Sequence, residues 1–146
     1  MRITEIDLQC EDIMWFAVDK YGHIFACTSA GEGNVPVFVC DSREKVNLLE
    51  EFFLEKLQFS TEEGYCVHVN QDNQLLRDFL ALSRKGIYCF DSYIDDKMQR
   101  QYRKVTAPVR PTFFDELPHD IQHLLSKNQI DVDVEISQFI VVPHAY

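Results

Sequence analysis

The sequence predicts an α+β fold, with a mainly antiparallel sheet, two main helices and one short helix. Three observations carry this prediction. Apolar runs of strand length stand between turn residues. Two stretches repeat apolar residues at helical spacing, and the last third of the chain alternates apolar and polar residues. The 146 residues are enough for one domain, so residues 1–146 are expected to fold as a single globular unit.

A β-hairpin is expected near the start of the chain. The runs IMWFAVD (13–19) and GHIFACT (22–28) are rich in aromatic and β-branched residues. Between them, DKYG places Asp19 at the start and Gly22 at the end of a turn, as a type I turn prefers. Because both runs are apolar throughout, we expect both faces of the hairpin to be covered and the hairpin to be central in the sheet.

The two main helices are expected at residues 41–57 and 71–86. Asp41 and Glu44 are spaced as a capping box, and Val46, Leu49 and Phe53 follow helical spacing. The second helix ends at Gly86, where a C-cap glycine belongs. The short helix is expected at 118–126, because Pro118 suits a first helical position. Further strands are expected at residues 65–69, 87–93, 101–107 and 131–142.

The five cysteines predict a reducing compartment. Their number is odd and no two have the C-x-x-C spacing. Four stand among apolar neighbours, as buried, reduced thiols do: Cys27, Cys40, Cys66 and Cys89. We therefore expect no disulfide framework and a cytoplasmic location. The N-terminal stretch has no apolar core, and no apolar run approaches a membrane span, so neither a signal peptide nor a membrane segment is expected.

The charge balance limits the class of partner. Asp and Glu number 24 against 14 Lys and Arg, which gives a net charge of −10. Such a field repels phosphate backbones, so nucleic acid is not an expected partner. The same field would steer a basic protein partner, although acidity can equally serve solubility alone. In the glycine-rich loop 29–36, Glu32 lies between the glycines and no Lys follows, so no phosphate site is expected.

The stretch LPHDIQHLL (117–125) is the nearest approach to a metal motif. His119 and His123 are four apart, as in the H-E-x-x-H pattern, but Asp120 stands where that pattern has Glu. On a helical wheel the histidines fall opposite the apolar residues, so we expect them to face solvent. A catalytic zinc site needs a third ligand, and the sequence suggests none nearby.

No other motif predicts a reaction. The sequence has no G-x-S-x-G motif and no cysteine paired with a histidine signal. We therefore predict a protein that is not an enzyme and needs no cofactor or metal. The acidic, aromatic stretch after residue 90 is the predicted partner interface, with four candidates: Asp91, Tyr93, Asp95 and Asp96.

Two stretches resemble a family of small bacterial proteins. WFAVDKYGHIFACTSAGEGNVP resembles a recurring opening of two apolar strands followed by a Thr-Ser-x-Gly loop. KGIYCFD, YRKVTAPVRP and DELPHDIQHLL resemble the later half of the same proteins. These are immunity proteins of bacterial polymorphic toxin systems. The resemblance implies a small cytosolic inhibitor that binds and occludes a toxin domain, in some cases a nuclease, and no binding residue carries over by motif.

Three functions therefore stand as hypotheses. The first is a non-enzymatic, immunity-type inhibitor of a basic toxin domain. The second is a small-ligand or adaptor module. The third is a metal-dependent hydrolase that uses His119 and His123.

Overall fold

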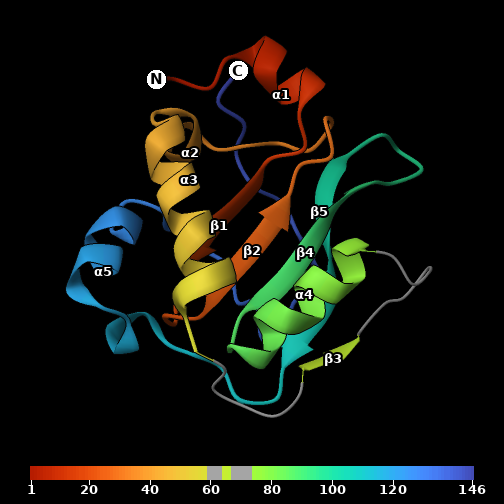
Figure 1. Ribbon diagram of the computed structural model, residues 1–146. Coiled ribbons are helices and arrows are strands. Elements are labelled where there is room, and N and C mark those ends of the chain that lie inside the picture. The colour runs from red at the N-terminus through yellow and green to blue at the C-terminus, as the bar shows by residue number, and fades with distance from the viewer. Residues whose placement is uncertain (59–63, 67–73) are drawn as a thin grey trace.

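The computed structural model describes residues 1–58, 64–66 and 74–146. Within these ranges, six strands form one sheet in the order β1-β2-β4-β5-β3, with β6 also paired to β5 (Figure 1). The strands are β1 (Met14–Val18), β2 (Ile24–Thr28), β3 (Gly64–Cys66), β4 (Tyr88–Ile94), β5 (Arg100–Pro108) and β6 (Phe139–Ile140).

The sheet is mixed, which corrects the expectation of a mainly antiparallel one. β1 and β2 form the predicted antiparallel hairpin, and β4 and β5 form a second one. The two hairpins join through a parallel pair, β2 with β4. The described part of the chain between β2 and β4 contains three α-helices, one π-helical turn and the short strand β3. Such a crossover makes the next strand parallel.

Helices are more numerous than predicted. Over the described residues there are five α-helices, one π-helical turn (η1, Phe52–Lys56) and one 3-10 turn (η2, Phe114–Glu116). The α-helices are α1 (Glu5–Cys10), α2 (Val37–Cys40), α3 (Arg43–Glu51), α4 (Gln74–Arg84) and α5 (His119–Leu125). The sequence analysis missed α1 and α2, both of which are short. A signal for α1 was present, since Thr4 and Asp7 form a capping box.

Two apolar layers lie on opposite faces of the sheet. Alternate residues of β1 point to opposite faces, as a strand requires. Trp15 and Ala17 pack with residues of α1, α2 and the C-terminal segment. Phe16 and Val18 pack with residues of α3, η1, α4 and α5. In Figure 1, α3 and α4 lie in front of the sheet and the C-terminal segment passes behind it.

The expected coverage of the hairpin on both faces is confirmed, because every residue of β2 is buried and only Met14 of β1 is not. The expected central position is right for β2 and wrong for β1, which lies at an edge of the sheet. That edge is nevertheless covered. The Val18 N–H donates to the Asn128 carbonyl at 2.8 Å, and the Asn128 side chain donates to the Phe16 carbonyl at 3.0 Å.

The helix predicted at 41–57 exists with a different beginning and end. Ser42 is the N-cap and accepts from the Lys45 N–H, so the capping box of Asp41 and Glu44 is wrong. Asp41 instead pairs with Arg2 at 3.0 Å, and Glu44 with the N-terminal amine. The α-helix ends at Glu51 and continues as the π-helical turn η1.

The end of the second main helix is as predicted. Gly86 has φ of 95°, and the Ile87 N–H donates to the Leu82 carbonyl, which is the Schellman arrangement. The predicted start at residue 71 and most of the strand predicted at 65–69 lie outside the described residues. The strands predicted at 87–93 and 101–107 are confirmed as β4 and β5.

The strand predicted at 131–142 is wrong over most of its length. Only Phe139 and Ile140 pair with β5. Before them, the Ser137 N–H donates to the Asp133 carbonyl, which closes a turn instead of a ladder. The apolar residues of the alternating pattern are still buried against the sheet, Ile140 from β6 and Val134 and Val142 from irregular backbone.

Candidate functional site

The histidines of the short helix face solvent, as predicted. His119 and His123 are exposed, whereas Ile121 and Leu125 of the same helix are buried. Across the described ranges, the structure assembles its three-residue group of possible metal ligands elsewhere, at Asp19, His23 and Asp133.

The four predicted interface residues lie on one hairpin, on β4 and the turn that follows it. Asp91 is half-buried and accepts from the Thr28 hydroxyl at 2.7 Å, and burial raises the pKa of its carboxyl. The Tyr93 ring contacts Phe139, and the Arg103 guanidinium lies 4.6 Å from its centre. Asp95 accepts from two backbone N–H groups of the turn, those of Lys97 and Gln99.

Three of these candidates therefore have a role inside the fold. Asp91 and Asp95 hold backbone and hydroxyl groups in place, and Tyr93 packs against a neighbouring strand. Asp96 is exposed at the turn. A partner contact at this hairpin stays a prediction.

A groove lies between α3–η1 and α5, with a volume of about 460 Å³. Its lining is mostly apolar, with the ring of Phe52 and the side chains of Ile121 and Leu124. Leu48 contributes an aliphatic side chain that is 49% exposed. The groove is called the α3–α5 groove below.

The rim of the α3–α5 groove is charged. Glu51 and Asp120 stand on its two helical walls. Lys56 also lines it, and its ammonium lies 3.7 Å from the Glu51 carboxylate. A second, smaller hollow continues along the acidic side of α3 and η1, beside Glu50 and Glu55. The apolar periodicity of this helix predicts the face that packs on the core, but it does not show which apolar residue stays uncovered.

A buried polar cluster lies at the turn of the hairpin β1–β2. Asp19 directly follows β1, and its side chain is fully buried. One carboxylate oxygen accepts from the N–H groups of Tyr21 and His23, at 2.9 and 2.8 Å. The other lies 2.9 Å from His23 Nδ1 and accepts from the Val134 N–H at 3.0 Å. Asp19 therefore joins the hairpin turn to the C-terminal segment.

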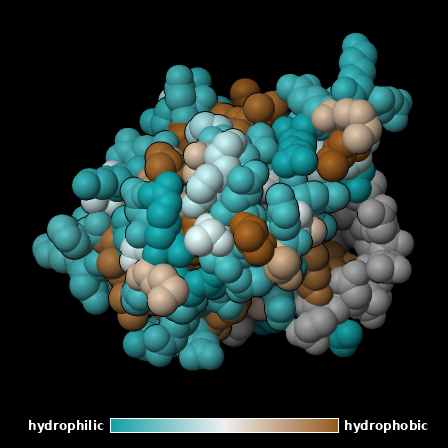
Figure 2. Space-filling view, turned by 90° about the horizontal axis from the view of Figure 1, so that it is seen from above, coloured by the Kyte–Doolittle hydropathy of each residue, from teal (hydrophilic) through white to brown (hydrophobic). Residues whose placement is uncertain are grey.

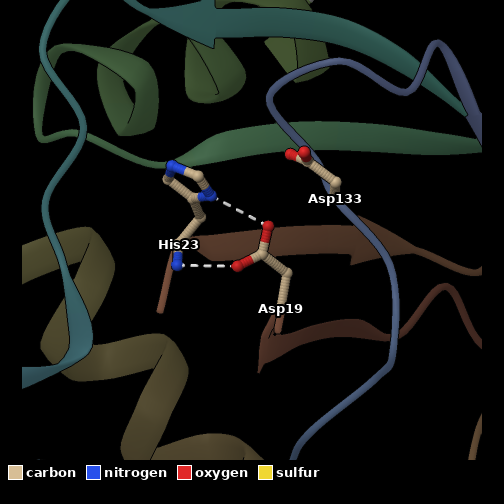
Figure 3. Close-up of side chains that lie close together, drawn as sticks. All are labelled: Asp19, His23 and Asp133. Atoms are coloured by element: carbon tan, nitrogen blue, oxygen red, sulfur yellow. Dashed lines mark hydrogen bonds and ion pairs between the residues drawn. The ribbon is translucent and has the colours of Figure 1, made fainter. Parts of the chain in front are cut away.

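His23 is held between two carboxylates and several rings. Its Nε2 lies 3.4 Å from Glu135, on the side away from Asp19. Its ring is 5.1 Å from the Phe113 ring and 5.4 Å from the Tyr88 ring, measured between centroids. Asp133 approaches from the C-terminal segment (Figure 3), so that ligand atoms of Asp19, His23 and Asp133 lie within 4.8 Å of one another.

A lysine lies close to this cluster. Lys104 on β5 is buried, and its ammonium donates to the Glu135 carbonyl at 3.1 Å and lies 5.3 Å from the centre of the Tyr88 ring. Burial lowers the pKa of Lys104, and the carboxylates of Asp133 and Glu135 oppose that shift. The sequence analysis gave His23 no role, because Asp133 is 110 positions away and only the fold brings it near.

The cysteines agree with the prediction where the structure describes them. Cys27, Cys40 and Cys89 are buried free thiols, and Cys10 is an exposed one. The side chain of Cys66 lies outside the described residues. Among the helices of the described part, none is both long and apolar enough to cross a membrane.

Comparison with known proteins gives no relative. No protein-family model, no curated protein and no solved structure matches the chain.

Proposed function

We propose that this protein is a non-enzymatic binding protein whose partner is a basic protein domain, as an immunity-type inhibitor of a bacterial toxin would be. The observation that carries the proposal is the α3–α5 groove, an apolar floor whose walls carry the acids Glu51 and Asp120 and the base Lys56, in a chain of net charge −10. Apolar anchors and complementary charge are what a protein interface uses.

The groove suits an amphipathic segment of the partner. An apolar side chain would fill the space beside Leu48 and Phe52, and Lys or Arg residues flanking it would face Glu51 and Asp120. This is the helix-in-groove mode of recognition, in which spaced apolar anchors give affinity and flanking charges give register. The net negative field would accelerate association with such a basic partner.

The end of the molecule that carries α1 and both termini is a less suitable place for the interface. Seen from the end that carries α1 and both termini, the surface is mainly hydrophilic, with small, separated hydrophobic areas (Figure 2). A docking face usually has a contiguous apolar centre. The α3–α5 groove offers one, so we place the principal contact there and leave the β4–β5 hairpin as a second candidate contact.

Affinity capture from the native cell, followed by a growth assay, tests the proposal. The full chain is compared with Leu48→Asp and with a matched control, Val37→Asp, since Val37 is 51% exposed on α2 outside the groove. A basic protein captured by the wild type and the control is expected to bind Leu48→Asp at least about 30-fold more weakly, the effect of losing a hot spot.

The captured domain, expressed alone, should arrest growth, and co-expression of the wild-type chain should restore it. Equal capture by all three chains would contradict the groove, and a captured partner without toxicity would contradict the inhibitor role. Asp96→Lys reports separately on the hairpin, because weaker capture by that variant would assign the hairpin a part of the interface.

A further inference from the structure

We propose that Asp19, His23 and Asp133 form a binding site for a divalent transition-metal ion, which would join the β1–β2 turn to the C-terminal segment. One imidazole nitrogen and two carboxylates form a donor set that zinc accepts. Their ligand atoms lie within 4.8 Å of one another, on two separate stretches of backbone, the hairpin turn and the C-terminal segment (Figure 3).

Asp133 is placed beside the Asp19–His23 pair by a turn of the C-terminal segment, in which its carboxylate accepts the Glu135 N–H at 3.0 Å. Asp19 and His23 bond to each other, and this bond accounts for the turn. Asp133 comes close to both, yet no hydrogen bond joins it to either of these described residues (Figure 3). Two carboxylates held this close repel each other in a partly buried setting, and the nearby Lys104 ammonium offsets part of that repulsion. A cation between them converts that repulsion into attraction.

The surroundings resemble the outer shell of a metal site. A metal-bound histidine usually presents its second nitrogen to a carboxylate, and bound carboxylates are themselves hydrogen-bonded. His23 Nε2 faces Glu135 at 3.4 Å, so Nδ1, which now lies 2.9 Å from Asp19, is the nitrogen that would bind the ion in place of that hydrogen bond. The Asp19 carboxylate is oriented by three backbone N–H groups, and the lone pair that now faces His23 Nδ1 would be available to the ion when that nitrogen carries no proton.

Two features set the expected affinity. Ligands at about 2.0–2.2 Å from a tetrahedral zinc ion stand about 3.5 Å apart, so Asp133 has to move inward by roughly 1 Å. Asp133 is half-buried and sits in a turn of the C-terminal segment, which makes this movement small in cost. The nearby Lys104 ammonium repels a cation, so we expect a moderate affinity, in the micromolar range.

Zinc titration of the full chain by calorimetry tests the site. His119 and His123 are replaced by Gln in every sample, which removes the exposed pair. The parent chain should bind one zinc ion and gain thermal stability on binding, since an ion that binds only the folded state stabilises it. Asp133→Asn should lower the affinity at least about tenfold, by analogy with the loss seen when a metal site loses a supporting residue.

Asp133→Asn keeps an oxygen that accepts the Glu135 N–H, so its folding without zinc should be unchanged. Asp131→Asn is the matched control, because Asp131 is an exposed acid two residues away. NMR of the His23 imidazole adds an independent readout, with the Nδ1 resonance shifting on zinc binding. No saturable binding, or equal binding by Asp133→Asn and the parent chain, would overturn the proposal.

Discussion

The reactivity of single residues in this protein depends on whether the fold buries or exposes them. The thiols illustrate this. Burial raises the pKa of the Cys89 thiol to about 12 and raises the pKa of Cys27 and Cys40 as well. Because the thiolate is the reactive form, a raised pKa and lack of solvent access both make these thiols inert.

Alkylation with iodoacetamide at pH 8 should therefore be selective. We expect Cys10 to be modified first, and Cys27, Cys40 and Cys89 to be modified at least about tenfold more slowly, because their thiols are protonated and inaccessible. Peptide mapping by mass spectrometry measures the order. In guanidinium chloride all of them should react alike, and fast native labelling of Cys89 would contradict the described core.

Asp91 should destabilise the fold at neutral pH. Burial raises its pKa above the ordinary value, and the Thr28 hydroxyl only partly opposes this. The folded state then binds the proton more tightly than the unfolded state, so stability falls as pH rises through the window between the two pKa values. Asp91→Asn, which still accepts from Thr28, should raise the Tm at pH 7.

The gain from Asp91→Asn should vanish as the pH is lowered below the ordinary Asp range, because the wild-type carboxyl is then protonated in both states. Thermal melts between pH 3 and pH 7 measure this. A gain that stays constant over the range would show that charge is not the cause.

At the scale of elements, connections between segments depend on a few polar and glycine residues. Asp19 is the clearest case, with four hydrogen-bonding groups around it in the hairpin and the C-terminal segment.

Asp19→Ala should cost about 3–5 kcal/mol of unfolding free energy, as expected when one partner of a buried polar network is removed. Urea denaturation measures it. The control is Asp12→Ala, an exposed residue bonded to the Ala30 N–H, which should cost about 1 kcal/mol or less.

Gly86 ends α4 and touches another segment. Its φ of 95° disfavours any side chain, and an added Cβ would collide with the Thr112 side chain and backbone N–H. Gly86→Ala should cost about 2–5 kcal/mol, from the left-handed backbone and the clash together. Gly22→Ala is the matched control. Its φ is 87°, but an added Cβ meets only Phe113 at 3.7 Å, so about 1 kcal/mol is expected. Equal losses in denaturant melts would contradict the close approach of Thr112.

At the scale of the whole molecule, the net charge of −10 acts on both stability and association. Like charges at the surface repel, and salt screens them over about 10 Å at 0.1 M. Raising NaCl from about 10 to 150 mM at pH 7 should therefore raise the Tm by a few degrees, roughly 1 kcal/mol. Near the isoelectric point of about 4.8 the same salt step should have little effect. A Tm that falls with salt at pH 7 would show that the ion pairs outweigh the repulsion.

Local structure with strong signals could be predicted from the sequence alone. The hairpin 13–28 followed from two apolar runs and the turn residues Asp19 and Gly22. The end of α4 followed from Gly86, and the exposure of His119 and His123 followed from helical periodicity. Each of these depends on residues within a few positions of one another, which is the range over which backbone preferences and side-chain spacing act.

Several features of the fold and of both candidate sites could not be predicted from the sequence. The parallel pairing of β2 and β4, the irregular path of residues 131–138 and the approach of Asp133 to His23 all depend on packing between distant segments. The α3–α5 groove has the same origin, because Leu48 fits the apolar stripe of α3 and only the position of α5 leaves it half-exposed. Burial is a property of the assembled molecule, so local pattern specifies the elements and packing decides which of their side chains meet.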